Sequence, residues 1–248
     1  MGAPTLAACY SVPAVLRTLA IDIGGSGLKA AVLDSDGEMT TERVRVDTPV
    51  GAPPAEVVAA LVGMVRELPA YDRVATGFPG MVRNGIVLTA PNLGHDGWSG
   101  YPLAAELEDA LGRPVRVAND ADVQGLAVID GRGVEMVITL GTGFGSGLYD
   151  NGRLCPHLEL SHHRFRKGET YDEQLGEETR KRIGDKKWQH RVLRAIDNMR
   201  ELTHFDRLFV GGGNARRLEC ELPGDVTIVD NSAGVRGGIY LFEDRPRG

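Results

Sequence analysis

The stretch LAIDIGGSGLKAAVL, Leu19 to Leu33, decides the fold, because it places a carboxylate, three glycines and a hydroxyl between two apolar runs. As a bare pattern it is a hairpin turn, since glycine reaches positive φ without steric cost. It is equally typical of a phosphate-binding loop, in which backbone N–H groups and a hydroxyl approach an anion. Taken alone, the stretch leaves both interpretations open.

The same pattern of strand, glycine loop, strand and turn occurs a second time further along the chain. Residues 134–140 form an apolar strand, 141–145 read GTGFG, 146–149 form a second strand, and 150–152 give a turn. We interpret this as an internal duplication, with two related α/β lobes that face a central cleft and each contribute a glycine loop to its floor. A third glycine cluster, VGGGNA at 210–215, follows another strand. No Walker A or GxGxxG motif is present.

Hydrophobic periodicity and turn residues predict the other elements. Strands are expected at 18–23, 28–33, 42–46, 74–77, 86–88, 115–118 and 207–210, and helices at 54–68, 101–111, 188–202 and 232–242. We expect an N-terminal lobe over 17–118 and a C-terminal lobe over 119–235. A C-terminal helix, 236–248, is expected to pack back on the first lobe, and 1–16 form a leader without a basic region.

Composition excludes several classes of protein. The chain has 248 residues, 42% hydrophobic and 25% charged, and no apolar run approaches the roughly 20 residues of a membrane helix. Cys9, Cys155 and Cys220 lie far apart without CxxC spacing, which argues against a disulfide framework and a thiolate metal site. A net charge of −6 argues against nucleic-acid binding. A cytoplasmic protein is the default expectation.

With residues 22–29, 140–148 and 210–214 in view, the sequence resembles the ROK family of sugar kinases, which has the actin-like or ribonuclease-H-like fold. Through 139–163 it is most similar to the polyphosphate glucokinase subgroup. The resemblance implies a phosphate-donor site in the glycine loops. Its residues would be Gly24, Gly25, Ser26, Gly27, Lys29, Gly141, Thr142, Gly143, Gly211, Gly212 and Gly213, with the N–H groups of Gly141 and Gly143 on the transferred phosphate. Asp22 would orient Mg²⁺, through water.

The sugar side of the resemblance rests on two motifs. In ANDAD, 118–122, Asn119 would bind sugar hydroxyls and Asp120 would be the general base; the pattern alone equally fits a helix cap. In ELSH, 159–162, Glu159 and His162 would bind the sugar, and serine stands where the family has glycine. Gly80 and Asn92 fall where the family places further sugar contacts.

One segment departs from the family pattern. Most members follow the second sugar motif with a cysteine-rich zinc site, whereas here the chain reads HRFRKGETYDEQLG without cysteine. We therefore predict no structural zinc. An additional sugar-binding carboxylate is expected in this region, with Asp172 and Glu173 as the candidates.

The resemblance implies a kinase that transfers a phosphoryl group from polyphosphate, ATP or both to the 6-hydroxyl of a hexose, with glucose preferred and a homodimer expected. Residues 164–194 hold ten lysines and arginines against six acidic residues, which suits a polyanionic donor or simply gives solvated helix faces. Mannose, fructose or an N-acetyl amino sugar remain alternative substrates. A non-catalytic or regulatory ROK protein is a further alternative, although only about seventeen residues precede the first strand, too few for a helix-turn-helix.

Overall fold

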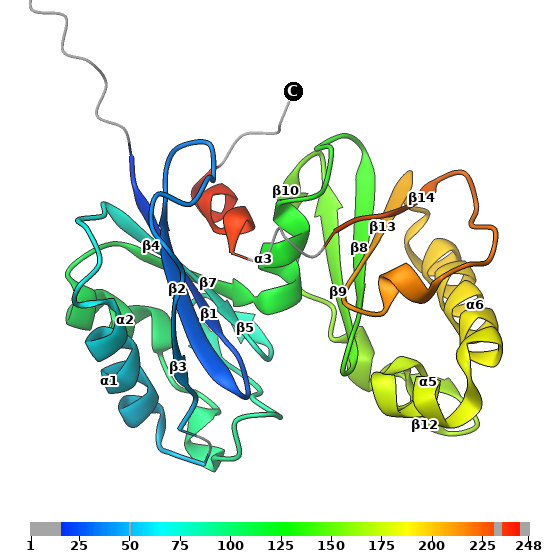
Figure 1. Ribbon diagram of the computed structural model, residues 1–248, viewed down its shortest axis with the longest axis horizontal. Coiled ribbons are helices and arrows are strands. Elements are labelled where there is room, and N and C mark those ends of the chain that lie inside the picture. The colour runs from blue at the N-terminus through cyan, green and yellow to red at the C-terminus, as the bar shows by residue number, and fades with distance from the viewer. Residues whose placement is uncertain (1–15, 50, 231–234, 244–248) are drawn as a thin grey trace, which may run out of the picture.

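The computed structural model describes residues 16–49, 51–230 and 235–243, and its framework is two mixed five-stranded sheets (Figure 1). The first sheet has the order β3-β2-β1-β4-β7. Neighbouring strands are antiparallel from β3 to β1 and parallel from β1 to β7. Its strands are β1 (Thr18–Ile23), β2 (Gly27–Leu33), β3 (Val44–Asp47), β4 (Arg73–Phe78) and β7 (Val115–Asn119).

The second sheet repeats this plan with the order β10-β9-β8-β13-β14. Again two antiparallel pairs are followed by two parallel ones. Its strands are β8 (Val134–Leu140), β9 (Phe144–Asp150), β10 (Arg153–Leu154), β13 (Arg207–Gly211) and β14 (Val226–Ile228). The predicted duplication and the α/β class are therefore confirmed. The first glycine loop joins β1 to β2, and the second joins β8 to β9.

Helices cover the sheets and connect them. The α-helices are α1 (Pro54–Val65), α2 (Leu103–Leu111), α3 (Asp120–Leu126), α4 (Tyr171–Leu175), α5 (Glu177–Ile183) and α6 (Asp185–Thr203). Short 3₁₀ segments are η1 (Asp96–Trp98), η2 (Leu160–His162), η3 (Ala215–Arg217) and η5 (Arg236–Phe242), and two small hairpins are β5 (Val82–Arg83) with β6 (Ile86–Val87) and β11 (Arg164–Arg166) with β12 (Glu169–Thr170). None of the helices in the described ranges is long and apolar enough to cross a membrane.

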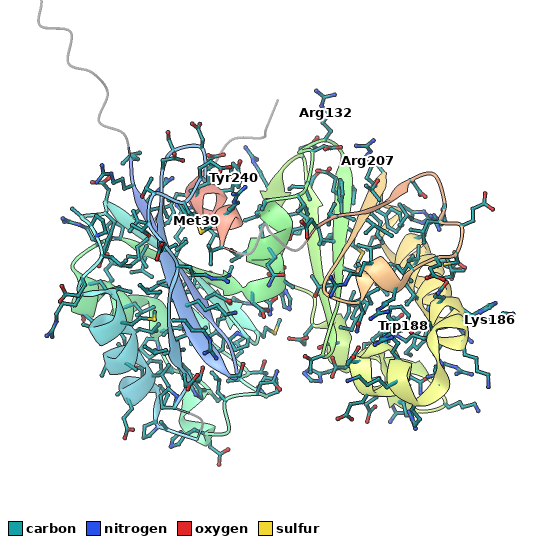
Figure 2. All side chains as sticks on the ribbon, viewed as in Figure 1. Met39, Arg132, Lys186, Trp188, Arg207 and Tyr240 are labelled. Atoms are coloured by element: carbon teal, nitrogen blue, oxygen red, sulfur yellow. The ribbon has the colours of Figure 1, made fainter. Side chains whose placement is uncertain are left out.

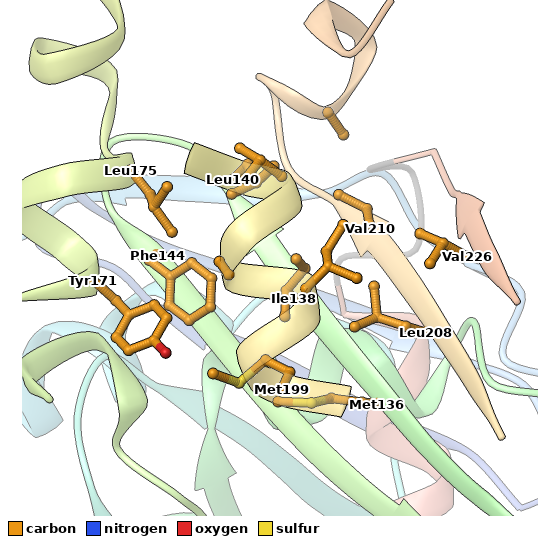
Figure 3. Packing of buried hydrophobic residues seen from close by; sticks show 14 of the residues in the cluster. Met136, Ile138, Leu140, Phe144, Tyr171, Leu175, Met199, Leu208, Val210 and Val226 are labelled. Carbon is orange, nitrogen blue, oxygen red and sulfur yellow. The ribbon is translucent and has the colours of Figure 1, made fainter. Parts of the chain in front are cut away.

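Each sheet has its own apolar core. In the first, the stripe Val57, Leu61 and Val65 of α1 is buried against β1 and β2. In the second, Met199 of α6 lies beside Met136 of β8, and Ile138 of β8 lies beside Val210 of β13, as Figure 3 shows. Such burial removes apolar surface from water and supplies most of the stabilisation of each lobe.

The helix α6 is amphipathic, with one buried face and one exposed face. Trp188 points inward and is fully buried, with its Nε1 donating to the Leu175 carbonyl at 2.8 Å, whereas Lys186 points away from the protein (Figure 2). The predicted start at residue 188 was too late, because Asp185 already opens the helix with an acidic residue in its first turn.

The helix α3 lies between the two sheets (Figure 1) and contacts β4, β8 and β9. The segment η5 packs on α3, β1 and β4, and its assignment to the first lobe stays a prediction. The segment is a 3₁₀ helix that ends at Phe242, within the predicted helical range; residues 232–234 and 244–248 of that prediction, and nearly all of the leader, lie outside the described residues. The lobe boundary at 118/119 stays a prediction.

Candidate active site

A cavity of about 390 Å³ is lined by residues of both lobes. It brings together most of the residues that the sequence singled out. These are Gly80, Asn92, Asn119, Asp120, Gly141, Thr142, Gly143, Glu159, His162, Gly212 and Gly213. Gly211 ends β13 opposite Thr139, a lining residue of β8, but does not itself line the cavity.

Asn119 and Asp120 occupy the junction where β7 ends and α3 begins. The Asn119 Oδ1 accepts the Ala121 N–H at 2.8 Å, which caps the helix, and its Nδ2 donates to the Gly80 carbonyl at 3.1 Å. Asp120 Oδ1 also accepts the Ala121 N–H, at 2.8 Å. The helix-cap interpretation is therefore correct for Asn119, and the same geometry aims Asp120 into the cavity.

The environment of Asp120 makes its carboxylate a stronger base than that of an ordinary aspartate. Burial raises the pKa of Asp120 to about 6, and the negative charge of Asp22 raises it further within that total. Asp22 is close because β1 pairs with β4 at Gly77, which in turn pairs with Ala118 of β7. A carboxyl that titrates near neutral pH can hold and release a proton in the cavity.

The second glycine loop is tightly built. The Gly141 N–H donates to the Gly143 carbonyl at 3.0 Å, and the Phe144 N–H donates to Asp172 Oδ1 at 2.8 Å. The Gly141 N–H therefore has a backbone partner here, and its binding of phosphate stays a prediction. A Cβ on Gly143 would lie 2.0 Å from Asp172 Oδ1, which explains why glycine stands there. Thr142 and the Gly143 N–H remain as lining groups for an anion.

The third glycine loop is fastened to the second. Asn214 donates through its backbone N–H to the Leu140 carbonyl at 2.9 Å and through Nδ2 to the Gly141 carbonyl at 3.1 Å. Gly212 has φ +91°, and a Cβ there would lie 2.2 Å from the Leu140 carbonyl oxygen. Only glycine fits this close approach. The two loops therefore form one rigid wall of the cavity.

The first glycine loop lies behind the opposite wall. Its residues Gly24–Gly27 and Lys29 do not line the cavity, although Gly25 packs against the backbone of Asn92, which does. The Gly24 N–H donates to the Gly27 carbonyl at 3.1 Å. Lys29 Nζ pairs with Asp22 Oδ2 at 3.0 Å, and its expected position near a donor phosphate stays a prediction.

The sugar-side motif Glu159 to His162 spans the start of η2. Ser161, which replaces a glycine in the family pattern, donates its hydroxyl to Glu159 Oε1. The nearby His157 lowers the pKa of Glu159, and the hydrogen bond from Ser161 lowers it too. Glu159 therefore presents an ionised, hydrogen-bond-accepting carboxylate to the cavity.

Sequence reasoning missed His157 and Asp122. His157 lines the cavity beside Glu159, and its Nδ1 lies 2.9 Å from Asp122 Oδ2. The two residues are 35 positions apart in the sequence, so no local pattern pairs them. The only sequence signal was a histidine two residues before Glu159, within the stretch that resembles the kinase subgroup.

The structure separates the two candidates for an additional carboxylate. Asp172 lines the cavity, whereas Glu173 is exposed and accepts the Thr170 N–H at 2.7 Å in the capping box of α4. Of the described residues, no group of three or more histidines, cysteines and acidic residues could hold a metal ion by itself. Asp22 with Asp120 nevertheless suits a hydrated divalent ion, which usually takes one or two carboxylates and completes its shell with water and phosphate.

Comparison with known proteins agrees with this geometry. A family model described as the ROK family matches residues 18–156. The chain is 30% identical over 235 residues to a polyphosphate glucokinase from Mycobacterium tuberculosis, covering 88% of each protein. It is 37% identical over 146 residues to an N-acetylmannosamine kinase from Escherichia coli, covering 56% of this chain and 49% of that one. An inorganic polyphosphate/ATP-glucomannokinase from Arthrobacter sp. strain KM gives a TM-score of 0.78 at 32% identity, covering 90% of this chain and 97% of that one.

Proposed function

The chain belongs to the ROK family, and from that premise we propose that it transfers a phosphoryl group from inorganic polyphosphate or ATP to the 6-hydroxyl of glucose. It is a sugar kinase with the actin-like fold. One observation carries the assignment of roles. A single cavity is lined by the titratable Asp120, by Asn119 and Glu159 of the two sugar motifs, and by Thr142 of the second glycine loop.

The reaction requires little covalent chemistry from the protein. In the proposed step, Asp120 accepts the proton of the sugar hydroxyl as its oxygen forms a bond to the terminal phosphorus of the donor. The bond from that phosphorus to its bridging oxygen breaks, and the donor leaves as ADP or as polyphosphate shortened by one phosphate. Thr142 and the Gly143 N–H are placed to stabilise the charge on the transferred group.

A divalent metal is the cofactor that ATP-using kinases of this kind generally need, and we propose Mg²⁺. Asp22 would hold it through water, in exchange for the Lys29 ammonium that now neutralises this carboxylate. The ion supplies positive charge against the donor phosphates. It would also offset the Asp22 charge that raises the pKa of Asp120.

Three arginines support polyphosphate as a donor. Arg166 and Arg191 both donate to Gln174, at 3.4 Å each, and no carboxylate among the described residues forms an ion pair with them or with Arg182. Burial lowers the pKa of Arg191, and repulsion from Arg166 and Arg182 adds to this. By contrast, Arg180 is neutralised by Glu177 and Asp185.

The position of these arginines suits a long anion. Gln174 lies on α4, the helix that also carries Asp172 at the glycine wall of the cavity. A polyphosphate chain that leaves the cavity along this helix would meet three cations, of which Arg191 has Glu169 as an acidic neighbour. ATP has no phosphates that extend so far, so the arginines should affect only the polymeric donor.

A kinetic matrix of donors against sugars tests the proposal. Polyphosphate and ATP would each be tried with glucose, mannose, fructose and N-acetylmannosamine in the presence of Mg²⁺, with the sugar phosphate measured directly. We expect the highest kcat/KM with glucose, and mannose as the next substrate. Turnover confined to N-acetylmannosamine would favour the alternative sugar class, and no product from any pair would refute the kinase assignment. The homodimer, the cytoplasmic location and the absence of structural zinc stay predictions.

A further inference from the structure

A chain of three charged groups runs from the protein interior to the sugar side of the cavity. Asp122 lies on α3 with its side chain only 2% exposed, and His157 is 6% exposed. His157 Nδ1 lies 2.9 Å from Asp122 Oδ2, and its Nε2 lies 3.6 Å from Glu159 Oε2. The imidazole therefore stands between a buried carboxylate and the carboxylate that faces the cavity.

The charge of His157 follows from its neighbours. Burial alone would lower its pKa, but the contacts with Asp122 and Glu159 outweigh burial and raise the pKa of His157 to about 9. The other ionisable groups around this chain are Asp120 on α3, Cys155 and His162. At neutral pH the imidazole is a cation between two anions.

The contact between His157 and Glu159 leaves the His157 Nε2 donor without a hydrogen bond. At 3.6 Å it is an ion pair and too long for a hydrogen bond, and His157 Nε2 has no hydrogen-bond partner among the described residues. Burying a donor without a partner is costly, typically by about 1–3 kcal/mol. A small movement of Glu159 toward His157 would satisfy it. Ser161 already holds the other oxygen, Oε1.

We propose that His157 is a positioning residue for sugar binding, which acts as a buried imidazolium that fixes Glu159 from behind while Ser161 fixes it from the side. The remaining lone pairs of Glu159 are then aimed at sugar hydroxyls. This inference rests on the proposed function, because it assigns a role within the same sugar site. It adds a pair, Asp122 and His157, that does not itself touch the sugar.

Two substitutions test separately the contact of His157 with Glu159 and its contact with Asp122. His157→Asn keeps an amide donor near Asp122 and removes the imidazole Nε2 that faces Glu159. Asp122→Asn keeps an acceptor for His157 but removes the charge that holds it protonated. Glucose binding is measured by calorimetry on the metal-free protein, and steady-state kinetics are measured with ATP, so that neither readout depends on polyphosphate.

We expect His157→Asn to raise the Kd and KM for glucose at least tenfold, while kcat falls less than threefold and the KM for ATP is unchanged. In the wild-type protein, glucose affinity should fall as pH rises through about 9, because the imidazolium is then lost. His157→Asn should lack that fall. Asp122→Asn should move it to lower pH, and this variant keeps the proposal testable if His157→Asn does not fold.

The outcomes are distinguishable. If the wild-type protein neither binds nor phosphorylates any hexose, the proposed function fails. If it does both, and a folded His157→Asn binds glucose with wild-type affinity and wild-type pH dependence, the role of His157 is wrong. An alkaline fall that Asp122→Asn leaves in place would also overturn it. Ser161→Ala is the matched control, since it loosens the same carboxylate without changing any charge, and should weaken glucose binding without altering the pH dependence.

Discussion

Replacing Asp120 with asparagine should stabilise the protein while abolishing its activity. The pKa of this carboxyl is about 6 in the folded protein against an ordinary 3.8, which corresponds to roughly 3 kcal/mol at about 1.36 kcal/mol per pH unit. Between these two pH values the unfolded chain has released the proton and the folded protein still holds it, so the free energy of unfolding falls as pH rises. Above about pH 6 the folded protein carries the full cost of the ionised carboxylate.

Asparagine removes this cost and keeps the oxygen that accepts the Ala121 N–H. In urea unfolding at pH 7.5 we expect Asp120→Asn to raise the free energy of unfolding by up to about 3 kcal/mol, with a melting temperature higher by up to roughly 6–12 °C. The gain should shrink as pH falls toward 4. Asp47→Asn, at a carboxylate that is 84% exposed, is the control and should change stability by less than about 0.5 kcal/mol.

A variant that is less stable than the wild-type protein at pH 7.5, or a difference that does not depend on pH, would refute the reasoning. The first result would mean that Asp120 makes a stabilising interaction as an anion. Turnover of Asp120→Asn should fall by orders of magnitude in either case, because the amide cannot accept the proton of the sugar hydroxyl.

Three further predictions follow from the described contacts. In the metal-free protein Asp22→Asn should lower the pKa of Asp120, measured by carbon NMR titration, because it removes the second-largest cause of the elevation; an unchanged value would contradict this. Gly212→Ala should destabilise the protein by at least about 2 kcal/mol in urea unfolding, whereas Gly213→Ala, with nothing within 4 Å of its added Cβ, should be tolerated. The double change Arg166→Gln and Arg191→Gln should raise the KM for long polyphosphate and leave that for ATP unchanged, with the double change of the exposed Lys186→Gln and Lys187→Gln as the charge-matched control; equal effects on both donors would argue against the arginines as a polymer site.

The two sheets could be predicted because their signal is local. An apolar run, a glycine loop and a second apolar run give adjacent antiparallel strands, and the structure places β1, β2 and β8 within one residue of the prediction. The segment η5 could not be predicted in the same way. A Cβ on Gly237 would lie 1.8 Å from the Val123 carbonyl oxygen, so that glycine serves a close packing on α3 that only the folded chain reveals.

The candidate site shows the same division. Asp120 and Glu159 lie in short motifs that stand out from the residues around them, and both line the cavity. The partners that set their charge come from elsewhere in the chain. Asp22 acts on Asp120 across three strands, and Asp122 meets His157 over 35 positions. The resemblance to the ROK motifs therefore indicated which groups face the cavity, and the protonation states depended on contacts that sequence patterns do not contain.

The packing of η5 on β1 and β4 has a consequence for how the protein is made. Ile239 fills a gap against Ala20 and Leu33 of the first sheet, and Phe242 lies under the guanidinium of Arg73 at 4.8 Å. These residues follow every strand of both sheets in the sequence, so they leave the ribosome after all of those strands. Until then the first sheet lacks the cover that η5 gives to β1 and β4, so this sheet is completed only after the strands of the second sheet have been synthesised. The two lobes should therefore mature together, and a chaperone that shields exposed apolar strands would have the most time to act on the first of them.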